Sequence, residues 1–519
     1  MQKQIEKGYP QPERWSYLWL ALGAVLLCLS TGQFRLAFAA WVAPAFLIRF
    51  IRSQRAGKGY WLTLLAMYVS LAISWRAILA QFFPSWPVYL IFIVFIAVQN
   101  SLPYLADRLL VPRLKGFTAT LVFPLAVTAL FLLSNLRNPF GSFGTPGYEQ
   151  YNNLALIQLV SVTGLWGLTF LVSWFGPVAN WAWERSFSWP QIRAGLAIFA
   201  GVVGVVLLFG GLRLAFPTSQ PGTVRVHGFY LESAWDEVPD MNTEMEAYRR
   251  FTRERNEQLI QETIRQADLG AQMVLWNEMA AIGVAEDIDQ LIARGREVAQ
   301  QEGIYLAMGL GIHFPGEDRP WEVKLVVIAP SSEIVIDHDK YGATFMYGLM
   351  GYGAALQGEY SLQAADTPFG TLSGVVCWDA DFPMTVRQAG AQKADLLLVA
   401  NGDSDRPYAK LHAQQHIFRA IENGLSLVRQ DAREFSLAAD PYGRVLAMVD
   451  LRAVAEPVMS VQVPTQGVFT LYSVIGDLFG WLTVVGFVLI AGWGILSGRR
   501  SSLADYAPSG AKGAQSAEG

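Results

Sequence analysis

Three side chains of complementary chemistry each follow a short strand-like run in the second half of the chain. They are Glu278 after Met273–Trp276, Lys340 after a run that begins at Glu333, and Cys377 after Gly374–Val376. A carboxylate can serve as a general base, a cysteine as a nucleophile, and a lysine as a fixed cation beside a developing oxyanion. One at a time, each has an ordinary interpretation as a loop glutamate, a solvated lysine or a structural cysteine. All three, however, stand where a predicted strand stops, which is where open α/β sheets place their sites.

The turn after Cys377 favours a chemical role for this cysteine. The chain contains two cysteines, which give neither a disulfide framework nor a zinc cluster, and Cys28 lies in a leucine-rich run where we expect it to pack. A free cysteine has a pKa of about 8.5 and needs a base or a cation beside it to become a thiolate. Because Cys377 ends an apolar strand and precedes the carboxylates Asp379 and Asp381, it is a candidate nucleophile.

A second chemical pattern is the pair His412 and His416, which are four residues apart as metal ligands on one face of a helix would be. No third ligand is evident from the sequence. We therefore interpret the pair as structural and expect no metal site.

The composition indicates that much of the chain lies in a membrane. The 519 residues are 52% hydrophobic and only 16% charged, against about a quarter charged in soluble proteins. A span needs roughly 20 apolar residues, so the second run below is marginal. The seven candidate runs before residue 220 are Trp15–Leu29, Phe34–Ile51, Tyr60–Leu79, Trp86–Leu105, Thr118–Leu133, Leu154–Trp183 and Ala194–Leu214, and an eighth is Val468–Leu496.

The segment between the last two runs has a different character. From Thr223 to about Val463, charges return at globular frequency and strand-like runs alternate with amphipathic helical patterns, which predicts an α/β layered domain. The formal net charge of −4 argues against a nucleic-acid partner.

Basic residues gather in alternate loops between the apolar runs. Clusters precede the first run and follow the second, fourth, sixth and last runs, whereas the loops 81–85 and 135–153 hold one arginine between them. Since short basic loops stay in the cytoplasm, the α/β domain is expected outside it and the tail inside. The alternative is that these residues only anchor helices at the membrane interface.

The three strand-end residues together resemble the triad of the nitrilase superfamily, which has Glu, Lys and Cys in this chain order. His416–Gly424 resembles the helix that follows the family's nucleophile, and Asp440–Arg444 resembles a late turn. The resemblance implies that Glu278 is the general base, Cys377 the nucleophile and Lys340 the oxyanion-stabilising cation, with no metal or other cofactor.

The membrane half narrows the resemblance to apolipoprotein N-acyltransferase. The segments Asn138–Gly141 and Leu156–Gly167 resemble that family, as does the order of membrane spans, catalytic domain and last span. The resemblance implies a multi-pass α-helical membrane domain plus an α/β nitrilase-like domain with an α-β-β-α layered sandwich. We expect a membrane domain of about seven helices over residues 1–220, a catalytic domain over 221–466, a last membrane helix over 467–498 and a disordered cytoplasmic tail over 499–519.

The implied reaction moves a fatty acyl chain from a phospholipid, through a Cys377 thioester, to the N-terminal amine of a diacylated lipoprotein. The implied location is the bacterial inner membrane, with the catalytic domain on the periplasmic side. The alternative enzyme is a membrane-anchored carbon–nitrogen hydrolase with the same triad and water as acceptor, and a scaffold that has kept the fold is a third reading.

The chain departs from the family pattern outside the triad. Asn277 stands where the family has proline, Arg433-Glu434 interrupts a usual Asn-Gly pair, and no acid lies between Lys340 and Gln357, with Gly348 near the position of a second family glutamate. The loop Gly342–Leu356 is rich in glycine, methionine and aromatic residues, and we interpret it as an apolar lid.

Overall fold

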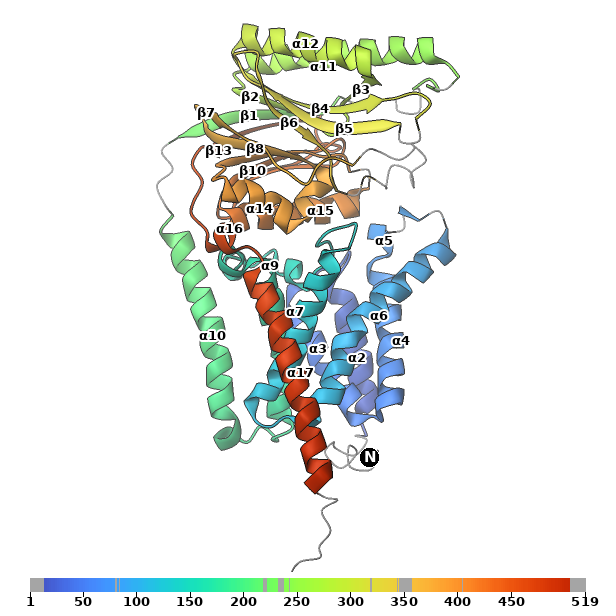
Figure 1. Cartoon of the computed structure of the whole chain (residues 1–519), viewed down its shortest axis with the longest axis vertical. Coiled ribbons are helices and arrows are strands. Elements are labelled where there is room, and N and C mark those ends of the chain that lie inside the picture. The colour runs from blue at the N-terminus through green and yellow to red at the C-terminus, as the bar shows by residue number, and fades with distance from the viewer. Residues whose placement is uncertain are drawn as a thin grey trace, which may run out of the picture.

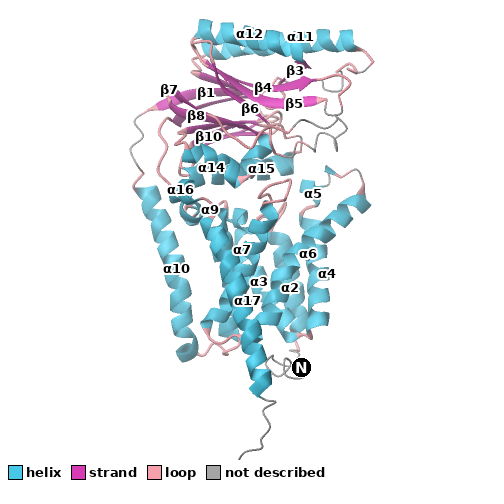
Figure 2. Cartoon of the chain, in the orientation of Figure 1, coloured by secondary structure: helices cyan, strands magenta, loops and turns pink. Residues whose placement is uncertain are grey.

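The protein is described by a computed structural model of a helical bundle joined to a layered α/β domain (Figures 1 and 2). The structure describes residues 14–79, 82–83, 85–217, 222–231, 238–241, 243–317, 320–342, 344, 357–403 and 405–504, the last eight by their backbone alone. The bundle forms one end of the molecule. The sheets form the other end, between two layers of helices.

Within the described ranges, eight long helices make up the bundle. They are α2 (Ser16–Ser30), α3 (Ala37–Ser53), α4 (Ala56–Ser74), α6 (Trp86–Leu110), α7 (Val122–Asn135), α9 (Val160–Trp183), α10 (Trp189–Ala215) and α17 (Leu478–Ala504). Shorter helical segments join them: α5 (Arg76–Leu79), η3 (Val111–Arg113), η4 (Phe117–Leu121), η5 (Pro146–Gln150), α8 (Leu154–Ile157) and α16 (Leu471–Ile475).

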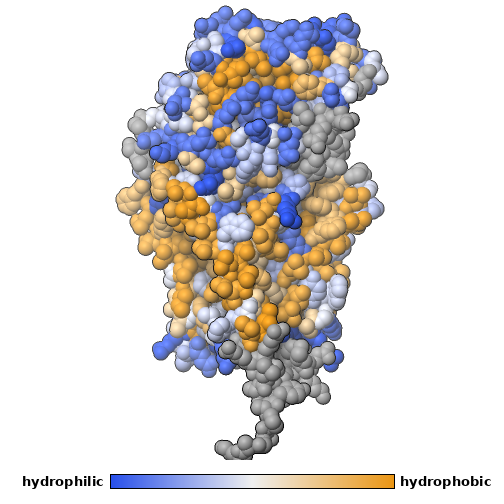
Figure 3. Space-filling model, in the orientation of Figure 1, coloured by the Kyte–Doolittle hydropathy of each residue, from blue (hydrophilic) through white to orange (hydrophobic). Residues whose placement is uncertain are grey.

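On the face of the molecule that Figure 3 shows, apolar side chains cover most of the bundle, whereas hydrophilic ones predominate on the α/β domain. Among the described residues, five helical segments are long and apolar enough to cross a membrane, and they include α6, α7, α9, α10 and α17. The 15 residues of α2 reach only about 22 Å at 1.5 Å per residue, short of the 30 Å hydrocarbon core. The protein is a membrane protein.

Two sheets form the centre of the α/β domain. The first has the order β13-β1-β2-β4-β5-β6, with β3 paired to β4, and the second has the order β12-β11-β10-β9-β8-β7. The strands of the first sheet are β1 (Thr223–Phe229), β2 (Met273–Trp276), β3 (Ala281–Val284), β4 (Tyr305–His313), β5 (Trp321–Ile328), β6 (Ile334–Asp339) and β13 (Val458–Pro464). Those of the second are β7 (Ala364–Thr367), β8 (Gly370–Val376), β9 (Leu396–Ala400), β10 (Ser426–Gln430), β11 (Phe435–Ala439) and β12 (Val445–Asp450).

Helices cover the outer face of each sheet. The helices α11 (Met245–Asp268) and α12 (Ala285–Glu302) lie on the first sheet, and α14 (Pro383–Ala391) and α15 (Arg406–Asn423) lie between the second sheet and the bundle (Figure 1). The parallel strands β8, β9 and β10 are largely buried on both faces, as parallel strands between two layers commonly are, and β9 is apolar throughout. The predicted α-β-β-α layered fold is confirmed.

The two halves are joined by polar contacts as well as apolar packing. The backbone N–H of Leu165 in α9 donates to Glu422 Oε1 in α15 at 2.9 Å. Ser142, in the loop between α7 and η5, donates its N–H and its hydroxyl to the carbonyl of Asp381. The junction therefore reaches the turn that follows Cys377.

Candidate active site

The ends of three strands bring Glu278, Lys340 and Cys377 into one buried region. Glu278 lies two residues after β2, Lys340 directly after β6 and Cys377 directly after β8. Lys340 Nζ donates to Glu278 Oε1 at 2.5 Å, and both side chains are buried. Gly402, which follows β9, lies between Cys377 and this ion pair. Its N–H donates to the Cys377 thiol, and a Cβ atom at position 402 would lie 3.0 Å from Glu278 Oε2.

The turn that begins at Cys377 has an unusual backbone. Cys377 opens the 3-10 segment η7 (Cys377–Asp381) with a φ of +48°, a value that residues other than glycine seldom adopt. Such local strain persists only where surrounding contacts hold it, and it concentrates at functional sites.

Asp379 supplies many of those contacts. Its Oδ2 accepts from the N–H of Val376 at 3.0 Å and pairs with His338 Nε2 at 2.9 Å. Its Oδ1 accepts from the N–H of Tyr341 at 3.0 Å and of Gly342 at 2.6 Å. One carboxylate thus ties the turn of Cys377 to the segment that carries Lys340.

The surroundings of Cys377 keep its thiol protonated in the resting protein. Burial raises the pKa of the Cys377 thiol well above its ordinary value, and the Glu278 carboxylate raises it further. Lys340 and the Gly402 N–H act in the opposite direction, because they favour the thiolate. A reaction at this sulfur therefore needs a base that removes the proton as the new bond forms.

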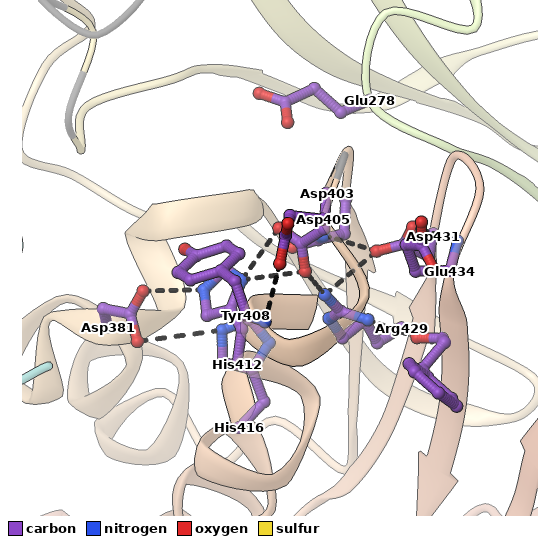
Figure 4. A network of polar contacts seen from close by, with 12 residues as sticks. Glu278, Asp381, Asp403, Asp405, Tyr408, His412, His416, Arg429, Asp431 and Glu434 are labelled. Carbon is purple, nitrogen blue, oxygen red and sulfur yellow. Dashed lines mark hydrogen bonds and ion pairs between the residues drawn. The ribbon is translucent and has the colours of Figure 1, made fainter. Parts of the chain in front are cut away.

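A buried network of charges lies beside the thiol (Figure 4). His412 stands between two carboxylates, with its Nε2 2.7 Å from Asp381 Oδ2 and its Nδ1 3.1 Å from Asp403 Oδ1. Arg429 pairs with Asp403, and also with Asp431 at 3.0 Å. Burial alone would raise the pKa of Asp403, but His412 and Arg429 hold it at about 2.

The sequence revealed only part of this network. Asp403 follows the buried strand β9 closely, which is the same strand-end signal that identified Glu278, and it was missed. Arg429 lies inside the buried strand β10, where a lone charge could have been noticed. The predicted lid Gly342–Leu356 cannot be compared, since apart from Gly342 and Thr344 it lies outside the described residues, as does Gly348.

A largely apolar cavity of about 520 Å³ extends from the bundle to Trp378, in the turn that begins at Cys377. Trp378, the neighbour of Cys377, lines it together with Tyr408 from α15. The Trp378 ring lies 4.9 Å from that of Phe140 and stacks on Phe143 with an angle of 12° between the planes. The other lining residues come mostly from the bundle and include Leu71, Phe92, Ile96, Val127 and Val172.

Comparisons with known proteins match both halves of the chain. Residues 244–468 match the family described as carbon-nitrogen hydrolase, and residues 23–178 match the apolipoprotein N-acyltransferase N-terminal domain. An apolipoprotein N-acyltransferase of Geobacter metallireducens is 25% identical over 94% of this chain and 96% of its own length. One of Rhodopseudomonas palustris is 25% identical over 66% of each chain.

Among solved structures, an amidase from Nesterenkonia sp. aligns with 49% of this chain and 94% of its own, at 20% identity and a TM-score of 0.38. The layered domain, its match and the apolar bundle define the class of protein: a membrane-bound member of the carbon–nitrogen hydrolase superfamily. The match of residues 23–178 agrees with the relative that is matched over nearly its full length, and the chain belongs to the apolipoprotein N-acyltransferase family. It is therefore an enzyme, an N-acyltransferase within that superfamily.

Proposed function

We propose that this protein transfers a fatty acyl chain from a phospholipid to the N-terminal amine of a diacylated lipoprotein, through a thioester on Cys377. The observation that carries the proposal is the cavity of about 520 Å³, which joins the bundle to Trp378 beside the buried thiol. An acyl chain gains about 0.8 kcal/mol for each buried CH₂, so a diacyl lipid stays in the bilayer. A cavity among apolar helices that ends at Trp378, the neighbour of Cys377, holds the acyl chain of the donor in such an environment close to the sulfur.

In the first step, Glu278 takes the thiol proton as Cys377 Sγ attacks the carbonyl carbon of the phospholipid ester. The carbonyl oxygen becomes negative beside the Lys340 ammonium, which is held in place by Glu278. The carbon–oxygen bond of the ester then breaks, the proton passes from Glu278 to the departing alkoxide, and a lysophospholipid leaves. The acyl chain remains as a thioester.

In the second step, the lipoprotein amine attacks the thioester carbonyl and Glu278 accepts a proton from the nitrogen. The tetrahedral intermediate again places its negative oxygen near Lys340. It collapses to an amide, and the released sulfur recovers the proton from Glu278. Acid and base roles fall to one carboxylate, which is therefore needed in both half-reactions.

Acyl-enzyme formation tests this function. The purified protein in detergent, given phospholipid, is expected to gain the mass of one fatty acyl chain on the peptide that contains Cys377. Neutral hydroxylamine should release the adduct, and the Cys377→Ala variant should form none. If no adduct forms with any of several phospholipid classes, the proposed first step is wrong.

The second half-reaction separates transfer from hydrolysis. A transferase excludes water from its thioester until an amine arrives, so the adduct should persist over minutes and disappear when a diacylated lipopeptide with a free N-terminus is added. A membrane-anchored carbon–nitrogen hydrolase would lose it equally fast with or without the lipopeptide. That result would replace the transferase with the hydrolase.

We also propose that the bundle spans the bacterial inner membrane with the α/β domain on its extracytoplasmic side. The basic clusters at the end of the bundle away from the sheets, such as Arg49, Arg52 and Arg185, support this orientation. Alkaline phosphatase fused after Pro221 should be active, and the same enzyme fused after Arg500 should be inactive. The reverse pattern would place the catalytic domain in the cytoplasm.

A further inference from the structure

A cluster of three potential ligands lies at the end of the turn that begins at Cys377 and takes no part in the proposed acyl transfer. Asp381 comes from the end of η7, and His412 and His416 come from successive turns of α15. One ligand atom from each lies within 4.8 Å of the others, and all three side chains are buried. The third ligand that the sequence did not reveal is Asp381, which is 31 residues from His412 along the chain.

The cluster contains buried polar atoms without partners. Neither ring nitrogen of His416 has a hydrogen-bond partner within the part of the chain that the structure describes, and its exposed fraction is 0%. Asp381 Oδ1 also lacks a hydrogen-bond partner there. Leaving such groups unsatisfied in the interior costs about 1–3 kcal/mol each, so their arrangement around a common point needs an explanation.

The spacing of these atoms fits a metal ion. His416 Nε2 and Asp381 Oδ1 are 4.0 Å apart. Zinc bonds of about 2.0–2.1 Å to nitrogen or oxygen, at the tetrahedral angle, place two ligands about 3.3 Å apart. A small movement of the His416 and Asp381 side chains toward each other would therefore bring both within bonding distance of one ion.

The orientation of His412 fits the same interpretation. Its Nε2 faces Asp381, while its Nδ1 lies 3.1 Å from both oxygens of Asp403. Histidine ligands commonly donate their second N–H to a carboxylate, which fixes the ring and raises its basicity. Asp403 is in turn paired with Arg429, so the supporting carboxylate is itself held in place (Figure 4).

We propose that Asp381, His412 and His416 bind one divalent transition-metal ion, with zinc as the best match to two imidazoles and a carboxylate. The ion replaces the proton between His412 Nε2 and Asp381 Oδ2, and that proton leaves to solvent. Its role is structural, because it joins the turn that begins at Cys377 to α15. The proposal does not depend on the acyl acceptor or donor.

The metal content of the purified protein tests the site. The full chain, carrying an affinity tag without histidine and grown with added zinc, is expected to hold about one zinc per chain after dialysis against a chelator. His416→Gln and Asp381→Asn should lose the metal. His313→Gln removes another buried histidine of the same domain and should keep it.

A ligand exchange keeps the test informative if these variants fold poorly. His416→Cys retains a metal ligand at this position, so cobalt bound to this variant should show a sulfur-to-metal absorption band that the wild type lacks. Zinc should also raise the melting temperature of the metal-free wild type but not that of His416→Gln.

Three results would overturn the proposal. The first is wild-type protein that holds no zinc or other transition metal even after growth with added metal. The second is equal loss from His313→Gln, which would indicate non-specific binding. The third is loss from Cys377→Ala, because Cys377, Asp403 and His412 also lie within 4.8 Å and would then be the ligands.

Discussion

At the scale of single residues, the central feature is a buried ion pair beside a protonated thiol. Lys340 and Glu278 are in contact at 2.5 Å, so the cation is oriented before any substrate arrives. Preorganised charge of this kind is worth most at the position where negative charge develops. The same contact holds the Glu278 carboxylate in the position that the proposed proton transfer from Cys377 requires.

Removing any one of these groups should remove most of the activity. Glu278→Gln, Lys340→Met and Cys377→Ala are each expected to lower transfer from phospholipid to a lipopeptide by roughly 10³-fold or more, since members of one catalytic unit are not additive. Lys393→Met, at an exposed lysine of the same domain, is the matched control for Lys340. A Lys340→Met enzyme with a near-normal rate and normal membrane insertion would exclude the oxyanion role.

Glu278, Lys340 and Cys377 could be proposed from the sequence because each follows a predicted strand, and this signal is local. It could not locate their common neighbour Gly402, because the contact depends on the order of strands within the sheets. Asp381 was read as part of an acidic turn, and its partner His412 was read as half of a histidine pair. Their 2.7 Å contact exists only because η7 packs against α15.

At the scale of elements, several predicted apolar runs of the membrane half each form more than one helical segment. The single run Leu154–Trp183 forms α8 and then α9, which is interrupted at Gly164 with a φ of +62°. A Cβ at Gly164 would lie 2.4 Å from the Tyr472 ring. Hydropathy cannot reveal this break, because it comes from packing against a residue more than 300 positions away.

The helices α9 and α15 meet through a buried carboxylate whose protonation should affect stability. Burial raises the pKa of Glu422 from 4.5 to about 7, although Arg419 acts to lower it. Between these values the folded protein keeps a proton that the unfolded chain has lost, so stability falls as the pH rises from about 4.5 through 7. Glu422→Gln removes this pH-dependent loss of stability, and the glutamine amide oxygen can still accept a hydrogen bond from the Leu165 N–H.

The melting temperature of Glu422→Gln, relative to the wild type, should therefore rise by a few degrees between pH 5 and pH 8. Thermal melts of detergent-solubilised protein across this range measure the difference directly. Glu257→Gln, at an exposed position of α11, should follow the wild-type curve. A constant difference between Glu422→Gln and wild type would show that this carboxylate does not titrate in the range.

At the scale of the whole molecule, the bundle does more than hold a catalytic domain at the membrane. Apolar packing continues from Leu71 and Ile93 in the bundle, through Trp378 and Tyr408, to Leu398 in the second sheet. The cavity follows the first part of this path, because Leu71, Trp378 and Tyr408 line it. The sequence predicted both halves of the molecule, but it did not indicate that Trp378 would pack against residues of both halves.

Narrowing the cavity should change which donors the enzyme accepts. Val127 of α7 lines the cavity, and Val127→Phe adds volume where an acyl chain would lie. We expect transfer from long-chain phospholipids to fall at least about tenfold, while short-chain donors lose less, since each excluded CH₂ forfeits about 0.8 kcal/mol of burial. Initial rates with a series of donors that differ only in chain length measure this.

Val122→Phe provides the control, because Val122 is a buried valine of the same helix that does not line the cavity. Overpacking at either site costs about 1–3 kcal/mol of stability, so both variants should melt at lower temperature. Only Val127→Phe should alter chain-length preference. If the two variants affect every donor equally, the acyl chain does not enter this cavity, and the cavity has no role in the choice of donor.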